Sequence, residues 1–233
     1  MLKGIVFDMD GVIVDSHPVH RRAWQNFLVT LGKEMPEQEL DFILDGRKRE
    51  EILRHFLGEL TAEQIAEYGN RKDEMLRKFE PDVAPIPGVI QFLQTLSSAN
   101  LKIALATSAT SERTLGTLQR LGIAPHFTVV VTGNDVIHGK PDPAIYRLAA
   151  ERLDVMPRDL LAFEDAVSGI CSAKTAGMKC FAIATNGRTR ELLAAGADYA
   201  VPNFLSLSLT RLKALWARLE QRRAPLVQTA GQD

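Results

Sequence analysis

Residues 2–11 read LKGIVFDMDG, and this stretch decides the fold. Apolar residues occupy both faces of the strand that it predicts, as in a parallel sheet covered on two sides. The strand ends at a polar stop, with the acids Asp8 and Asp10. Gly11 suits a turn at which the backbone comes close to a ligand. The stretch therefore predicts a buried first strand followed by a pair of carboxylates.

The segment that follows, from about residue 17 to residue 83, carries mostly helical signals. HPVHRRAWQNFLVTLG (17–32) has one apolar face and ends in glycine, and EEILRHFLG (50–58) repeats the pattern more briefly. Thr61 and Gln64 have the spacing of a capping box. This segment is therefore expected to be all-helical.

The pattern of predicted elements changes after the proline-rich segment 81–88, because short apolar strands and helices alternate from there on. That alternation predicts right-handed βαβ units and a parallel sheet covered on both faces. We therefore expect an α/β fold with three parts: a Rossmann-like parallel-sheet core (residues 1–16 and 85–223), a small all-helical cap inserted after the first strand (residues 17–84) and a flexible C-terminal tail (residues 224–233).

Composition narrows the class of protein. The chain has 233 residues, 45% of them hydrophobic and 24% charged, as in ordinary globular proteins. The net charge of −1 provides no field that attracts nucleic acid or an anionic membrane. No apolar run approaches the roughly 20 residues that span a bilayer, and acids interrupt the first dozen residues, which argues against a secretory signal. Cys171 and Cys180 make no disulfide framework. A cytoplasmic monomer is expected.

Polar residues also follow the later strands. Ligands of open α/β sheets bind beyond the carboxyl ends of the strands. One strand ends at Thr107 and Ser108, a loop before a helix carries Lys140, and a further strand ends at Glu164 and Asp165. Each feature alone has an ordinary interpretation, as a solvated turn, a surface lysine or a helix cap. Their combination in this order predicts a single polar crevice.

The chemistry of such a crevice suits phosphoryl transfer. Three converging carboxylates repel one another and need a cation, and hard oxygen ligands favour Mg²⁺. Together with a lysine, Mg²⁺ neutralises a phosphate and an attacking carboxylate. One carboxylate can act as nucleophile through an aspartyl-phosphate, and its neighbour two residues on can protonate the leaving alkoxide.

Four segments carry a family resemblance: FDMDGVIVDS (7–16), IALATS (103–108), GKPDP (139–143) and FEDAVSGI (163–170). In order, they resemble the four motifs of the haloacid dehalogenase-like hydrolase superfamily, and the likeness extends from Ile5 to about Val201. The helical segment resembles the small cap of the subgroup that contains β-phosphoglucomutase and sugar-phosphate phosphatases.

This resemblance implies catalytic roles by position. Asp8 corresponds to the nucleophile and Asp10 to the general acid and then base. Thr107, with the amide of Ser108, corresponds to the residues that hold the transferring phosphoryl oxygens. Lys140 corresponds to the lysine that balances the charge of the nucleophile.

The resemblance also implies a Mg²⁺ site. Its ligands would be Asp8, the backbone carbonyl of Asp10, and Asp165, with Glu164 as a further ligand. A small phosphorylated metabolite is the expected partner.

The cap decides the substrate, and three of its residues resemble the subgroup's substrate-binding positions: His20, Gly46 and Arg49. His20 could instead face solvent at the start of a helix, and Arg49 could be an i,i+4 partner on a charged helix face. Asp45 stands where the mutase has lysine, and an acid there should weaken the hold on a second phosphate. A phosphatase is therefore favoured over a mutase.

The predicted function is Mg²⁺-dependent hydrolysis of a small phosphomonoester, a sugar phosphate above all. The alternatives are a phosphosugar mutase and a catalytically silent binding module of the same fold. A dinucleotide-dependent oxidoreductase and a P-loop NTPase are disfavoured, because neither of their glycine-rich patterns follows a strand here.

Overall fold

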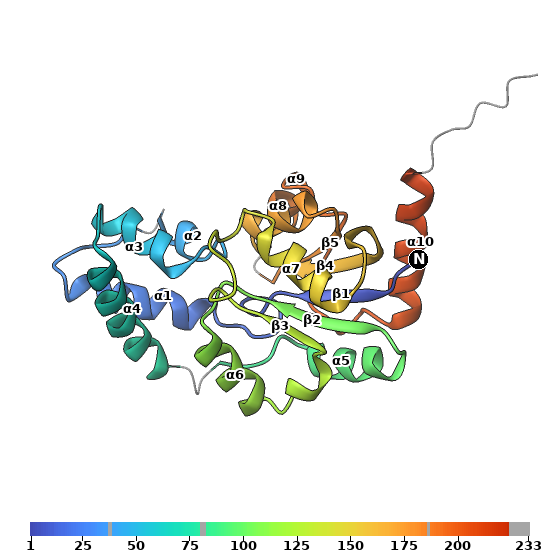
Figure 1. Ribbon diagram of the computed structural model, residues 1–233, viewed down its shortest axis with the longest axis horizontal. Coiled ribbons are helices and arrows are strands. Elements are labelled where there is room, and N and C mark those ends of the chain that lie inside the picture. Colours follow the sequence, from blue (N-terminus) through green and yellow to red (C-terminus); the bar gives the residue numbers. More distant parts are fainter. Residues whose placement is uncertain (37–38, 80–82, 186, 224–233) are drawn as a thin grey trace, which may run out of the picture.

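The computed structural model describes residues 1–36, 39–79, 83–185 and 187–223. Its centre is a six-stranded sheet with the order β3-β2-β1-β4-β5-β6, in which all neighbours are parallel (Figure 1). The predicted Rossmann-like parallel core is confirmed. The strands are β1 (Gly4–Phe7), β2 (Lys102–Ala106), β3 (Val129–Val131), β4 (Leu160–Glu164), β5 (Lys179–Ile183) and β6 (Tyr199–Val201).

The central position of β1 explains its continuous apolar sequence. The strand pairs with β2 on one side and with β4 on the other. Ile5 and Phe7 pack into the hydrophobic cluster on one face of the sheet, and Val6 packs into the cluster on the other. Burying such a side chain contributes about 1.5–3 kcal/mol. Both faces therefore demand apolar residues, and the strand shows no polar alternation.

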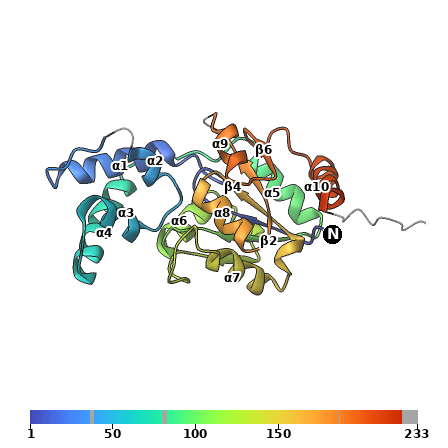
Figure 2. The same ribbon diagram turned by 90° about the horizontal axis from the view of Figure 1, so that it is seen from above.

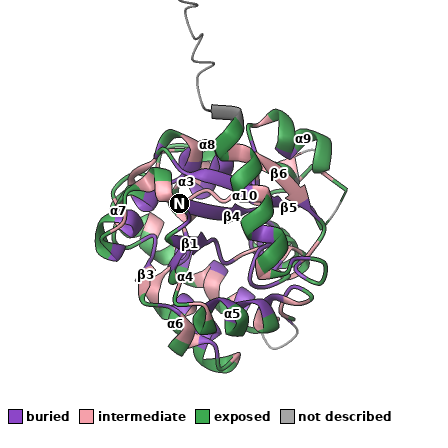
Figure 3. Cartoon of the chain, turned by 90° about the vertical axis from the view of Figure 1, so that its right-hand side faces the viewer, coloured by how far each residue is buried: buried purple, intermediate pink, exposed green. Residues whose placement is uncertain are grey.

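Helices cover both faces of the sheet. Helices α5 and α10 belong to the face that contains Phe7, whereas α7, α8 and α9 belong to the face that contains Val6 (Figure 2). In Figure 3 the buried strands lie inside a shell of helices whose outer surfaces are exposed. The helices of this core are α5 (Val89–Ser98), α6 (Ser111–Arg120), α7 (Ala144–Leu153), α8 (Val167–Thr175), α9 (Thr189–Ala194) and α10 (Leu209–Arg223).

Among the described residues between β1 and α5 there are four further helices: α1 (His17–Val29), α2 (Leu40–Ile43), α3 (Arg49–Leu57) and α4 (Ala62–Arg77). We call them the helical segment. They pack around a cluster of their own that includes Trp24, Phe27 and Leu53. Figures 1 and 2 show the helical segment on the side of the sheet toward which β1 runs.

The local signals of this segment agree with the structure. The capping box is formed: Gln64 N donates to Thr61 Oγ1 at 3.3 Å, and Thr61 N donates to Gln64 Oε1 at 2.9 Å. The two connections between the helical segment and the core meet at a backbone bridge between Val14 and Pro85. The exact division into cap and core stays a prediction.

Two elements differ from the expectation. Helix α5 is not among the predicted elements, although its buried residues Val89, Phe92, Leu93 and Leu96 have helical spacing. Strand β3 spans three residues of the apolar run 127–133, because it lies at the edge of the sheet and pairs with β2 alone.

Three further predictions concern the cysteines, membrane-spanning helices and the C-terminal tail. Both cysteines are free thiols. No helix within the described ranges combines the length and apolar character needed to cross a membrane. The predicted flexible tail, 224–233, lies outside the described residues.

Candidate active site

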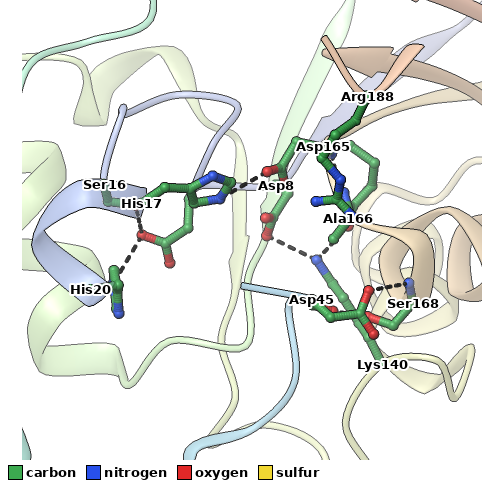
Figure 4. A network of polar contacts seen from close by, with 12 residues as sticks. Asp8, Ser16, His17, His20, Asp45, Lys140, Asp165, Ala166, Ser168 and Arg188 are labelled. Atoms are coloured by element: carbon green, nitrogen blue, oxygen red, sulfur yellow. Dashed lines mark hydrogen bonds and ion pairs between the residues drawn. The ribbon is translucent and has the colours of Figure 1, made fainter. Parts of the chain in front are cut away.

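The carboxyl ends of neighbouring strands bring the predicted polar residues together. Asp8 follows β1, Thr107 follows β2, and Glu164 ends β4. Lys140, from the loop before α7, donates to Asp8 Oδ1 at 2.8 Å and to Glu164 Oε1 at 2.6 Å (Figure 4). The side chains of Lys140 and Glu164 are both fully buried. Lys140 is therefore not a surface lysine, because it neutralises two buried carboxylates at once.

The Glu164 carboxylate accepts hydrogen bonds from several neighbouring groups. Tyr146 Oη donates to its Oε1 at 2.6 Å, and the amides of Asp165 and Ala166 donate to its Oε2 at 3.0 and 3.4 Å. Helix α8 passes so close that a Cβ on Gly169 would lie 2.0 Å from Glu164 Oε1. The glycine of the FEDAVSGI segment is therefore required by the carboxylate beside it.

Asp8, Glu164 and Asp165 form a compact acidic group. Each offers one oxygen, and these three atoms lie within 4.8 Å of one another. Asp165 Oδ2 is buried and faces His17, whose Nε2 lies 2.9 Å away. Three buried carboxylates that converge in this way fit a hard divalent cation. Gly11 approaches this group as well, since a Cβ there would lie 2.0 Å from Asp165 Oδ2.

The electrostatics of Asp8 reflect this crowding. Burial raises the pKa of Asp8 well above its ordinary value, Lys140 opposes that rise, and Glu164 and Asp165 add to it. A bound cation would act against burial, because its charge favours the ionised carboxylate.

Asp10 has a different environment. Its Oδ1 accepts from Ser16 Oγ at 2.5 Å and from Arg113 at 3.0 Å, and its Oδ2 accepts a second bond from Arg113. His20 Nε2 lies 3.4 Å from Oδ1. Burial acts to raise the pKa of Asp10, but Arg113 and His20 together outweigh it and hold the pKa well below its ordinary value. Asp8 and Asp10 therefore have pKa values shifted in opposite directions, with Asp10 favouring its ionised form. The negative charge of a bound phosphate would act to raise the pKa of Asp10 and so favour its protonated form.

His20 is largely shielded from solvent, with 16% of its side chain exposed. Burial lowers its pKa to about 4, helped by the charges of Lys72 and Arg113 and opposed by Asp10. At neutral pH it is therefore a neutral imidazole beside Asp10. The solvent-facing alternative is wrong.

Lys72, on α4, is a second buried lysine, 4% exposed. Its ammonium lies 5.3 Å from the ring centre of Trp24 and 3.5 Å from Asp73 Oδ1. Burial lowers its pKa to about 8, with Arg113 adding to the effect and Asp73 opposing it. Sequence reasoning missed Lys72, because its neighbours NRKDEM have the composition of an exposed helix face.

Replacing Lys72 with Met is expected to stabilise the fold at pH 7. The drop in pKa from 10.5 to about 8 corresponds to about 3 kcal/mol of unfavourable burial. Between these two values the unfolded chain binds more protons, so the free energy of unfolding of the wild type rises with pH. The variant's advantage should therefore be full below pH 8 and shrink toward pH 10.5. Urea unfolding at several pH values measures it, with Lys78→Met, an exposed lysine on the same segment, as control. A pH-independent difference would contradict this interpretation.

A cavity of about 90 Å³ lies between the strand ends and the helical segment. Most of the predicted site residues line it, whereas Lys140 and Glu164 lie outside the lining. The predicted residues in its wall are Asp8, Asp10, His20, Gly46, Arg49, Thr107, Ser108 and Asp165. Its wall also contains residues that were not predicted, namely His17, Lys72 and Arg113.

Hydroxyl groups have distinct roles around this cavity. Thr107 Oγ1 accepts from Ala109 N at 3.2 Å, which leaves its hydrogen available for a ligand. Ser108 Oγ instead donates to the carbonyl of Gly46 at 2.7 Å. Thr107 therefore suits contact with a phosphoryl oxygen, whereas the Ser108 hydroxyl joins the core to the helical segment.

Further contacts hold the segment 45–48 on the core. Asp45 Oδ1 accepts from the amide of Ser168, in the first turn of α8, at 3.0 Å (Figure 4). Lys48 Nζ donates to the carbonyls of Val136 at 2.7 Å and Ile137 at 3.2 Å. The helical segment is thus closed over the strand ends, and Asp45 supplies an acceptor to a helix whose own N-cap residue, Ala166, has none.

Arg49 is paired within the helical segment. Its guanidinium contacts Asp73 on α4, so it is not an i,i+4 partner along its own helix. It lines the cavity at the same time.

Comparisons with known proteins agree with this geometry. The family described as haloacid dehalogenase-like hydrolase matches residues 5–183. A phosphorylated carbohydrates phosphatase from Thermotoga maritima is 35% identical over 76% of this chain and 83% of its own length. The β-phosphoglucomutase of Bacillus subtilis is 33% identical over 95% of this chain and 98% of its own.

Solved structures share the fold. The crystal structure of β-phosphoglucomutase from Clostridium difficile superimposes with a TM-score of 0.86, covering 95% of this chain and all of that one, at 24% identity. The segments that hold Asp8, Thr107, Lys140 and Glu164 all lie inside the matched range 5–183. The chain belongs to the haloacid dehalogenase-like hydrolase family.

Proposed function

We propose that the protein is a Mg²⁺-dependent phosphatase of small phosphomonoesters, sugar phosphates above all. The observation that carries this proposal is the position of Asp8, which lies in the wall of a cavity, 2.8 Å from Lys140 and within the acidic group. A buried carboxylate beside a lysine and a cation site is arranged to attack a phosphoryl group.

The reaction proceeds in two steps. A carboxylate oxygen of Asp8 attacks phosphorus and the bond to the leaving oxygen breaks, while Asp10 gives that oxygen a proton. Water then attacks phosphorus of the aspartyl-phosphate, Asp10 accepts the proton of that water, and inorganic phosphate and Asp8 are released. Thr107 would hold a phosphoryl oxygen through its hydroxyl, together with the amide of Ser108. Lys140 keeps the charge of Asp8 balanced in both steps.

The acidic group would hold the cation through Asp8 and Asp165, with the backbone carbonyl of Asp10 and with Glu164 as a further ligand. Mg²⁺ suits this all-oxygen set and supplies positive charge that neutralises the phosphate. Because the pKa of Asp8 is raised by burial, a cation would also favour the ionised nucleophile.

The residues of the helical segment would recognise the leaving group. Arg49 lines the cavity with its guanidinium paired to Asp73, whereas His20 and Lys72 reach the cavity from the helical segment and offer mainly hydrogen-bond donors. Donors of this kind suit the hydroxyls of a sugar or polyol. Two relatives support a substrate of this class by name: the phosphorylated carbohydrates phosphatase, and hexitol phosphatase A of Escherichia coli.

A phosphosugar mutase is the second candidate, because the relative that covers 95% of this chain is a β-phosphoglucomutase. A mutase must hold a second phosphate, and the basic stretch 47–49 is where this chain would do so. Each of its cations is already engaged: Arg47 with Asp45, Lys48 with core carbonyls, and Arg49 with Asp73. These pairings favour the phosphatase.

The test is phosphate release from a panel of sugar phosphates, phosphoglycolate and nucleotides, with Mg²⁺ and then with EDTA. We expect Mg²⁺-dependent release, greatest for a phosphorylated sugar or polyol. In parallel, β-glucose 1-phosphate with a catalytic amount of the bisphosphate tests for glucose 6-phosphate. Formation of glucose 6-phosphate faster than release of phosphate would identify a mutase. Inactivity in both assays would favour a silent module.

A further inference from the structure

Asp10 is oriented by a residue 103 positions away, Arg113 on α6. The guanidinium of Arg113 grips both carboxylate oxygens, with NH1 donating to Oδ1 at 3.0 Å and NH2 donating to Oδ2. Ser16 Oγ gives Oδ1 a second hydrogen bond at 2.5 Å. A carboxylate oxygen accepts about two strong hydrogen bonds, so Oδ1 is saturated. In the described part of the chain, Oδ2 is therefore the oxygen that can still accept a hydrogen bond. The two hydrogen bonds from the Arg113 guanidinium fix the direction in which this oxygen points.

The position of Arg113 in its helix would be destabilising without the contact to Asp10. It is the third residue of α6, whose N-cap is Thr110. A cation in the first turn opposes the helix dipole at a cost of about 0.3–1 kcal/mol. Its side chain is also largely buried, with 16% exposed. The pairing with Asp10 offsets both penalties, so the position makes sense only in relation to that carboxylate.

The connection to the phosphoryl site is short. Helix α6 begins four residues after Thr107, whose hydroxyl suits a phosphoryl oxygen. One loop and one helix turn therefore place both the phosphoryl-binding hydroxyl and the group that turns Asp10. Arg113 and Asp10 line the same cavity, and His20 and Lys72 face them from the helical segment.

We propose that Arg113 is a positioning residue that presents Oδ2 of Asp10 to the leaving-group oxygen. This inference rests on the proposed phosphatase function. As the bond between phosphorus and the leaving oxygen breaks, the proton on Asp10 Oδ2 passes to that oxygen. In hydrolysis of the aspartyl-phosphate, the same atom takes the proton of the attacking water. Arg113 itself neither gains nor loses a proton.

The test compares leaving groups. Glucose 6-phosphate releases an alkoxide that needs a proton, whereas p-nitrophenyl phosphate releases a stabilised phenolate that does not. Hydrolysis of the aspartyl-phosphate is common to both substrates, so the comparison uses kcat/KM, which reports the steps up to release of the leaving group. For Arg113→Met we expect kcat/KM for glucose 6-phosphate to fall about 10²-fold, the size of a general-acid contribution, and kcat/KM for p-nitrophenyl phosphate to fall less than about 5-fold. Arg113→Lys keeps the charge but not the paired hydrogen bonds, and should recover part of the loss.

The matched control is Arg152→Gln, which removes an Arg–Asp pair of 2.8 Å on the outer surface. It should change neither rate. Equal losses of kcat/KM on both substrates with Arg113→Met would overturn the inference while leaving the phosphatase intact.

A wild type that releases phosphate neither from these two compounds nor from any other member of the panel would instead contradict the proposed function. In that case a crystal structure of Arg113→Met still decides the orientation. If the Asp10 carboxylate keeps its direction in the variant, Arg113 does not position it. If the carboxylate rotates, the positioning role stands independently of any activity.

Discussion

Asp8→Asn is expected to abolish Mg²⁺-dependent phosphate release, with a loss of about 10⁴-fold or more, as for other covalent nucleophiles. The amide cannot form the aspartyl-phosphate, and it removes one oxygen ligand from the acidic group. The fold should survive, because the Asn carbonyl can still accept from Lys140 Nζ, which lies 2.8 Å from Asp8 Oδ1. Phosphate release on the best substrate of the panel measures the effect.

Stability measurements separate this loss from misfolding. Three buried carboxylates within 4.8 Å repel one another, so Asp8→Asn should be at least as stable as the wild type in EDTA. Added Mg²⁺ should stabilise the wild type more than the variant, since a ligand that binds only the folded state raises stability by mass action. Asp154→Asn, an exposed acid elsewhere on the core, serves as control. Residual release above a hundredth of the wild-type rate would show that another group attacks phosphorus.

The site residues that the sequence predicted in the core share one property: they follow strands or precede a helix next to a strand. In a parallel sheet those positions meet at one edge, so Asp8, Thr107 and Glu164 could be placed together from the pattern of apolar runs alone. Lys140 could be added because its loop leads into the next helix. The same reasoning explains why the order of motifs was more informative than any one of them.

His17, Lys72 and Arg113 line the cavity without having been predicted, and all three come from helices, where a charged residue ordinarily points to solvent. Lys72 has no local signal, because only the packing of α4 against α1 buries it beside Trp24. Arg113 has a weak signal, a cation in the first turn of a helix that prefers acids there. Asp45 was interpreted as an unfavourable neighbour for phosphate, whereas its carboxylate accepts a hydrogen bond from α8. Tertiary contacts of this kind join segments that are distant in the chain, and the local periodicity of the sequence does not predict them.

Lys140→Met is expected to lower both stability and activity. Lys140 is the cation shared by the Asp8 and Glu164 carboxylates. Removing one partner of a buried ion pair costs about 3–5 kcal/mol, because the remaining charge stays buried and uncompensated. Phosphate release should fall about 10³-fold, since the charge that balances Asp8 during attack is gone. Urea unfolding in EDTA and steady-state phosphate release measure the two effects.

The double variant Lys140→Met/Glu164→Gln separates these two consequences. Glutamine at 164 is uncharged and keeps an amide oxygen that can accept from Tyr146, whose hydroxyl lies 2.6 Å from Glu164 Oε1. One of the two uncompensated charges is thereby removed, so about half of the lost stability should return. Activity should not return, because Asp8 still lacks its cation. If instead both properties recover together, Lys140 acts only by holding the fold, and its assignment to the phosphoryl chemistry is wrong.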